Sequence, residues 1–180
     1  MFFISLLLND PQRYFLWILL VVFSVCLHEY FHALIALSQG DRTAADRGHL
    51  TLNPLVQMGV MPIIFLLLVG IAWGATPVNP RNLKKKYSGA LVSFAGPFSN
   101  FMLYFIFCLA MAISLKSGLT SDGIFVLCSL GAILNFVLFV FNMIPVPPLD
   151  GFSIACYFFP SLAYRDSEIK NAAMFVIFMV

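Results

Sequence analysis

Two histidines and one glutamate stand within a single turn of a long apolar run. His28, Glu29 and His32 form the pattern H-E-x-x-H. Positions i and i+4 lie on the same face of a helix, so both imidazoles can reach one metal ion and Glu29 lies beside it. This spacing suits zinc with a water molecule in its open coordination position, whose proton the carboxylate can accept. The pattern therefore predicts a metal site at His28 and His32.

The surroundings of this motif strengthen the metal interpretation. The pattern by itself is weak, because it also occurs by chance. However, a charged side chain near the centre of a bilayer costs roughly 2.5–3.5 kcal/mol. The run Phe15–Ser38 contains no basic residue that can neutralise Glu29. A bound cation supplies the compensation that the two imidazoles and the carboxylate need.

A catalytic zinc of this kind needs a third protein ligand, and Asp150 is the strongest candidate. It lies in N-M-I-P-V-P-P-L-D-G, residues 142–151, where prolines can brace a turn that aims one carboxylate at a fixed point. The alternative is that Asp150 caps a helix that begins at Phe152. The remaining aspartates lie in polar stretches or turns: Asp10, Asp41, Asp46 and Asp122.

The composition indicates that these residues lie in a membrane protein. Of the 180 residues, 61% are hydrophobic and 10% are charged, whereas soluble domains have about 45–50% and 25%. A small soluble fold cannot hide that much apolar surface, which argues against a soluble enzyme, a disordered chain or a nucleic-acid-binding protein. The net charge of +2 is too small to indicate an anionic polymer as partner.

The apolar residues gather in long runs: Phe15–Ser38, Leu55–Ala75, Gly89–Leu115 and Gly123–Ile144. A membrane helix needs about 20 predominantly apolar residues, so the first, third and fourth runs are long enough. The second is interrupted by Pro62 and several glycines, and Ala172–Val180 has only nine residues. The four cysteines form no CxxC pair and are expected to be small core or lipid-facing residues.

A shared metal ion constrains how these runs are arranged. His28 and His32 lie near the end of the first run and Asp150 follows the fourth, so these two helices should point the same way. The third helix must run antiparallel to the fourth, and Leu55–Ala75 then cannot be a simple crossing. We expect an all-α polytopic membrane protein with three core transmembrane helices, plus a re-entrant or hairpin segment with short extended strands.

A cluster of basic residues predicts the orientation in the membrane. Arg81 and Lys84–Lys86 precede the third run without an acid among them. Positively charged loops stay in the cytoplasm, which places the predicted site toward the cytoplasm and the N-terminus outside.

The paired motifs resemble the site-2 protease family of intramembrane zinc metalloproteases, in its compact prokaryotic branch. H-E-x-x-H in an early membrane helix is followed by N-x-x-P-x-x-P-x-D-G. Residues 48–54 (G-H-L-T-L-N-P), 77–82 (P-V-N-P-R-N) and 95–100 (A-G-P-F-S-N) are similar to further segments of that family.

The resemblance runs from about Cys26 to Gly151, with two departures. His49 stands where that branch often has arginine, and we assign it no role. Phe152 stands where many members have a second glycine, which we expect to alter the turn without removing the neighbouring aspartate from the site.

The resemblance implies roles for individual residues. One zinc ion is held by His28, His32 and Asp150, and Glu29 is the catalytic general base. Asn142 matches the asparagine that is proposed in the family to hold the unwound substrate backbone.

Three amides are further candidates for supporting a ligating imidazole or binding substrate: Asn53, Asn100 and Asn142. Each of them can equally be a helix cap or an interhelical hydrogen bond. An extended segment near residues 48–54 or 76–80 can bind substrate by strand addition.

The activity implied by the resemblance is regulated intramembrane proteolysis by a single metalloprotease domain, residues 1–180. The substrates are transmembrane helices cut near the cytoplasmic face, the other partner is the lipid bilayer, and the location is a prokaryotic cell membrane. The alternatives are a divalent-metal transporter and a catalytically idle relative that binds membrane helices. A transport pathway needs polar groups at several depths, and the third run offers few.

Overall fold

The computed structural model describes residues 3–117 and 122–164 of the chain. Three of its helices are long and apolar enough to cross a membrane: α2 (Pro11–Ser38), α6 (Ser88–Ser117) and α7 (Asp122–Asn142). Helices of 20 or more residues span about 30 Å, which is the thickness of the hydrocarbon core. The prediction of three core transmembrane helices is therefore confirmed.

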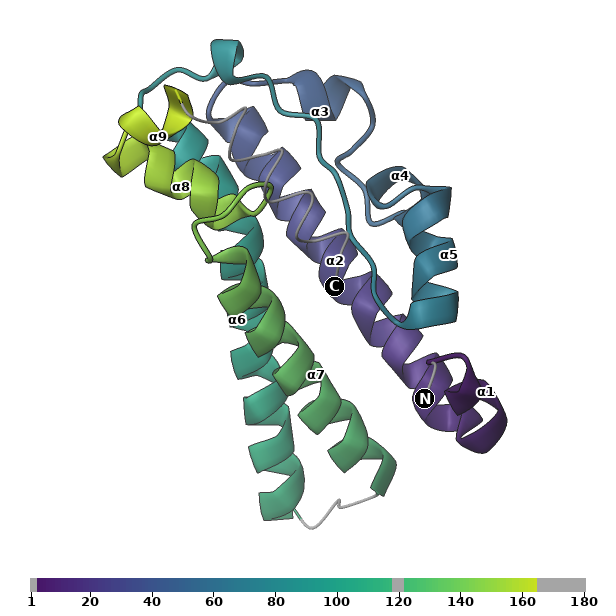
Figure 1. The fold of residues 1–180 in the computed structure, drawn as a ribbon. Helices are drawn as coiled ribbons and strands as arrows, with labels where there is room; N and C mark the ends of the chain where they lie inside the picture. The colour runs from purple at the N-terminus through teal and green to yellow at the C-terminus, as the bar shows by residue number, and fades with distance from the viewer. Residues whose placement is uncertain (1–2, 118–121, 165–180) are drawn as a thin grey trace.

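The directions of the long helices agree with those expected from a shared metal ion. α2 and α7 run toward the same end of the molecule, and α6 runs the opposite way (Figure 1). α6 packs against both of the others. Short helices lie at the two ends of the long ones: α1 (Ser5–Asn9) at one end, and α8 (Asp150–Phe158) and α9 (Ser161–Tyr164) at the other.

Between α2 and α6 the chain turns back instead of crossing. It forms three short helices: α3 (Thr43–Asp46), α4 (Pro54–Gln57) and α5 (Val60–Val69). The ten residues of α5 span about 15 Å, half of a bilayer core. α5 ends at Gly70, whose φ of 86° is left-handed and favours glycine. The chain then returns beside α2 to the 3₁₀ helix η1 (Pro80–Asn82) (Figure 1).

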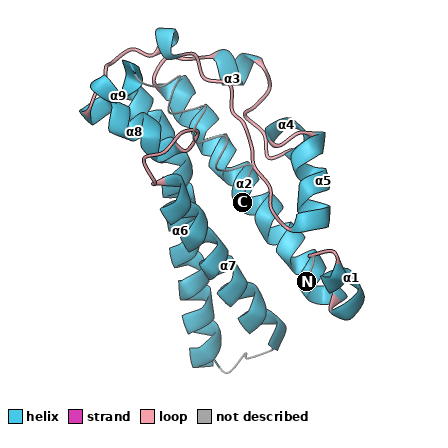
Figure 2. Cartoon of the chain, in the orientation of Figure 1, coloured by secondary structure: helices cyan, strands magenta, loops and turns pink. Residues whose placement is uncertain are grey.

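The prediction of short extended strands is wrong, since no part of residues 3–117 or 122–164 forms a strand (Figure 2). We call residues 71–79, the returning coil, the strap. A hydrogen bond from Ala75 N to Gln57 O (3.1 Å) joins the strap to α4, which is too little for a ladder. Hydrogen bonds that involve side chains hold the strap instead: Thr76 Oγ1 bonds Glu29 O on α2, and Asn79 N bonds the carboxylate of Asp41.

Asp41 ties the end of the strap to the end of α2. Its fully buried carboxylate accepts hydrogen bonds from Thr43, from Asn79 N (2.7 Å) and from Asn82 Nδ2 (2.9 Å). Burial raises the pKa of Asp41, but these hydrogen bonds outweigh it and lower the pKa to about 2.

The core and the surface have the polarity of a membrane protein. The buried apolar cluster joins α2 to the α4–α5 region and α7: Leu20, Val21, Val25, Cys26, Met58, Leu66 and Leu134. Large apolar side chains are exposed along α5, α6 and α7, including Phe105, Ile106 and Leu109 on α6. This surface is stable in lipid and not in water, so the chain is an integral membrane protein.

Candidate metal centre

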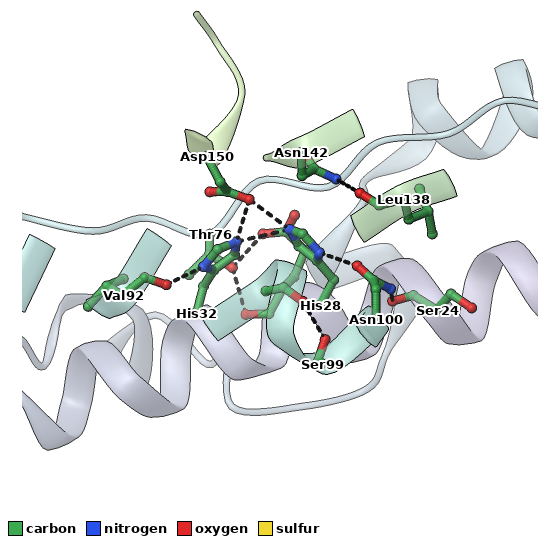
Figure 3. A network of polar contacts seen from close by, with 12 residues as sticks. Ser24, His28, His32, Thr76, Val92, Ser99, Asn100, Leu138, Asn142 and Asp150 are labelled. Atoms are coloured by element: carbon green, nitrogen blue, oxygen red, sulfur yellow. Dashed lines mark hydrogen bonds and ion pairs between the residues drawn. The ribbon is translucent and has the colours of Figure 1, made fainter. Parts of the chain in front are cut away.

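Residues from the first and the last part of the fold converge at one point (Figure 3). The Nε2 atoms of His28 and His32, one turn apart on α2, are 3.0 Å from each other. Oδ2 of Asp150, at the start of α8, lies 3.1 Å from Nε2 of His28 and 3.3 Å from Nε2 of His32. His28 and His32 are buried, with 7% and 8% of their surface exposed. The structure thus brings together the three residues that the sequence singled out.

The hydrogen-bond partners of the imidazoles assign their protons. Nδ1 of His32 lies 2.7 Å from Val92 O, a carbonyl that can only accept. Nδ1 of His28 lies 2.6 Å from Oδ1 of Asn100, whose amide nitrogen donates to Asn135. Nδ1 therefore carries a proton in both imidazoles, and Nε2, which faces Asp150 in each, is the atom that can bind a metal ion.

The resulting donor set fits a zinc ion. Two imidazole lone pairs and a carboxylate oxygen lie 3.0–3.3 Å apart, and they repel one another unless a cation lies between them. A tetrahedral zinc with bonds of about 2.0–2.2 Å places its ligands about 3.3–3.6 Å apart. Within the described part of the chain, no other group of three His, Cys, Asp or Glu residues has this proximity.

A glycine on α6 leaves room at the metal-facing side of the imidazoles. A Cβ atom on Gly96 would lie 2.6 Å from Cδ2 of His28 and closer still to Nε2 of both His28 and His32. Ordinary van der Waals contact begins near 3.4 Å. Only glycine at this position allows α6 to approach α2 while the two nitrogen atoms remain accessible.

A second glycine lets α8 begin beside the imidazoles. A Cβ atom on Gly151 would lie 2.6 Å from Ile144 O and closer to the carbonyl of Met143. Asp150 is the first residue of α8 and Leu149 is the N-cap, so the alternative that Asp150 caps the helix does not describe it. Phe152 is buried, and Asp150 lies beside the two imidazoles with phenylalanine at this position.

Glu29 lies beside this cluster and faces the strap. Thr76 Oγ1 lies 2.7 Å from Glu29 Oε2 and 3.0 Å from Glu29 O. A cavity of about 570 Å³ is lined by Glu29 and the three clustered residues, with walls from the strap, the start of α6 and α8. A substrate in this cavity can therefore reach the carboxylate and the cluster together.

The three candidate asparagines lie in different surroundings. Asn100 is fully buried and contacts His28. Asn142 lines the cavity, although its amide donates to Leu138 O (2.9 Å) within α7 (Figure 3). Asn53 is exposed, caps α4 by accepting a hydrogen bond from Leu55 N (3.0 Å), and does not line the cavity. Their roles in supporting an imidazole or binding substrate stay predictions.

A buried polar chain behind Asn100 was not recognised from the sequence as support for the site. Asn135 and Ser24 are fully buried, and Asn135 Nδ2 donates to Ser24 Oγ (3.0 Å). Polar residues inside long apolar helices were the available signal. Thr76 was marked only as part of the segment 76–80 that can bind substrate, and Gly74 only as one of the glycines that interrupt the second apolar run. Neither residue was expected to contact Glu29.

Comparisons with known proteins agree with this geometry. Residues 111–180 match the model of peptidase family M50. A Bacillus subtilis protein named "Putative zinc metalloprotease YwhC" is 35% identical over 170 residues, covering 91% of this chain and 78% of the relative. No solved structure matches the chain significantly.

Mycobacterial relatives match over a shorter part of their length. "Putative zinc metalloprotease Rip2" of Mycobacterium tuberculosis is 33% identical over 141 residues, and that of Mycolicibacterium smegmatis is 32% identical over 140 residues. The chain spans about half of their length, 52% and 51%, with 72% of its own residues. The match to the Bacillus protein covers most of both chains, and H-E-x-x-H meets a distant aspartate in one cavity. The chain therefore belongs to peptidase family M50, the site-2 protease family.

Proposed function

We propose that the protein is an intramembrane zinc endopeptidase that cleaves transmembrane helices near the cytoplasmic face, as in regulated intramembrane proteolysis. One observation carries this proposal. Two imidazole lone pairs and one carboxylate converge beside Glu29 in a single cavity, and the imidazoles belong to a helix long enough to span the membrane.

His28, His32 and Asp150 would hold the zinc ion. When bound, the ion supplies a Lewis acid that polarises a carbonyl and acidifies a water molecule. The hydrogen bonds of Nδ1 to Asn100 and Val92 orient the two imidazoles and make them better ligands.

Glu29 would move the proton. Hydrolysis forms a bond between the water oxygen and the scissile carbonyl carbon, and the bond from that carbon to nitrogen breaks. Glu29 accepts a proton from the water and returns it to the departing amine nitrogen, as general base and then general acid. Its burial next to the strap keeps bulk water from competing for its proton.

The cavity favours an unwound substrate. A helix with its side chains is about 10–12 Å wide, so side chains hold its backbone away from any surface it touches. His28 and Glu29 are each only 7% exposed, so a transmembrane helix has to lose its hydrogen bonds locally before its backbone reaches them. Asn142 and the strap line this cavity and can bind the exposed backbone groups.

The basic cluster supports a cytoplasmic orientation. Arg81 lies in η1 and Lys84–Lys86 precede Ser88, the first residue of α6. This end of α6 is the end that carries α8 (Figure 1), and Lys86 itself lines the cavity. Since positively charged loops remain inside, the cavity faces the cytoplasm of a prokaryotic cell.

Substitution of the base tests the proposal. The purified protein in proteoliposomes should bind one zinc and cleave a labelled transmembrane peptide, and removal of zinc by a chelator should stop cleavage. Glu29→Gln should keep the zinc and lose at least about 100-fold in kcat. Asp46→Asn, which alters an exposed carboxylate paired with Arg42, should cleave as the wild type does. Unchanged cleavage by Glu29→Gln would contradict the proposal, and zinc flux without cleavage would favour a transporter.

A further inference from the structure

The carboxylate of Glu29 is held by one hydroxyl group. Thr76 Oγ1 lies 2.7 Å from Oε2 and is the hydrogen-bond donor to this carboxylate among the residues that the structure describes. Glu29 is only 7% exposed, and none of the ion pairs within the described ranges includes it. Its orientation therefore depends on a neutral donor on the strap.

The strap also encloses the aliphatic part of Glu29. A Cβ atom on Gly74 would lie 2.7 Å from Cδ and Oε1 of Glu29 and closer still to Cγ. The backbone at Gly74 thus lies directly against the side chain and restricts the torsions of its aliphatic part, which leaves rotation of the carboxylate about the last bond.

The chain is anchored on both sides of Thr76. Trp17 Nε1 on α2 donates to Gly70 O (2.8 Å), just before the strap, and Asn79 N at the end of the strap donates to Oδ2 of Asp41 (2.7 Å), three residues beyond α2. Between these anchors, Ala75 N donates to Gln57 O (3.1 Å). The Thr76 hydroxyl therefore has a defined position relative to the helix that carries Glu29.

We propose that Thr76 is a positioning residue for the peptidase reaction. Its hydroxyl holds Oε2 of Glu29 and so fixes the plane of the carboxylate. The other oxygen, Oε1, lies near Gly74 at the wall of the cavity and receives the proton of the attacking water. Rotation about the last bond of a glutamate is broad and nearly unrestricted, and a base acts only within hydrogen-bond reach of its proton. Removing the hydroxyl lowers the fraction of molecules in which Glu29 is aimed correctly. This inference rests on the function proposed above.

The test compares a substitution that removes the hydroxyl with one that keeps it. Thr76→Val removes the hydroxyl and keeps the shape, whereas Thr76→Ser keeps the hydroxyl. With the labelled transmembrane peptide, Thr76→Val should lower kcat at least about tenfold, with KM within about twofold and one zinc retained. Thr76→Ser should keep kcat within about threefold of the wild type. Ser129→Ala is the matched control, because that hydroxyl bonds only carbonyls of its own helix.

Several results would overturn the inference. One is a kcat of Thr76→Val equal to that of the wild type, and another is a kcat of Thr76→Ser lowered as much as that of Thr76→Val. A third is a change in the KM of Thr76→Val with its kcat unchanged. Zinc loss in the Val variant with zinc kept in the Ser variant would also overturn it, since Thr76 would then act on the metal site. If Thr76→Val does not accumulate in the membrane, Thr76→Ala removes the same hydroxyl and is judged by the same criteria. Absence of zinc-dependent cleavage by the wild type refutes the proposed function instead.

Discussion

Gly96→Ala tests the packing of α6 on the metal centre. The added methyl group would lie 2.6 Å from Cδ2 of His28, about 0.8 Å short of the 3.4 Å at which ordinary contact begins, and its overlap with both Nε2 atoms is larger. Zinc–nitrogen bonds tolerate deviations of about 0.2 Å. The methyl group can be accommodated only if α6 moves away from α2 or an imidazole rotates. Either movement misplaces a ligand by several times that tolerance.

We expect Gly96→Ala to weaken zinc binding at least about 100-fold, since even residues that merely support a ligand change metal affinity by 10–100-fold. Competition with a coloured chelator measures the affinity of the purified protein, and elemental analysis gives the zinc content. Gly123→Ala is the matched control, because a Cβ atom at Gly123 meets no atom within 4 Å. One zinc per chain with an affinity within threefold of the wild type in Gly96→Ala would refute the steric reasoning.

Three further predictions concern the residues around the site. Gly151→Ala should lower zinc affinity, measured by the same competition, because its methyl group meets backbone carbonyls and shifts the start of α8; unchanged affinity contradicts this. Because the pKa of Asp41 is lowered to about 2, its ionised form stabilises the fold above about pH 4, and this contribution disappears as the pH falls through 2. The difference in melting temperature between the wild type and Asp41→Asn should therefore shrink over this range, and a constant difference would refute the assignment. Asn135→Leu should lower the free energy of unfolding by about 1–3 kcal/mol, because Asn100 and Ser24 lose a buried partner; thermal unfolding in detergent measures it, and wild-type stability would argue against the network.

The membrane-spanning helices and the paired histidines could be predicted because their signals are local. Three apolar runs of sufficient length became α2, α6 and α7. The spacing of His28 and His32 fixes their shared face through the helical repeat alone, whatever else packs around them. Even Asp150 was indicated by its unusual place between apolar residues and prolines.

The strap shows where local reasoning failed. An apolar segment with glycines and a proline favours broken geometry, and strands were one form of it. A strand, however, exists only where a second segment offers a ladder of backbone partners. Packing placed α2 beside residues 71–79, so side chains such as Trp17 and Asp41 hold the segment instead.

The sequence by itself determined the lengths of the helices, their apolar character and the residue types that can bind a cation. Tertiary structure decided that Oδ2 of Asp150 meets an imidazole 122 positions earlier and that Thr76 bonds Glu29. It also decided which candidate amide contacts His28, since Asn100 does so whereas Asn53 caps a helix. The physical reason is the range of the interactions. Helix formation depends on neighbours a few residues apart, whereas a buried polar atom takes its partner from whichever distant segment the packing brings within 3 Å.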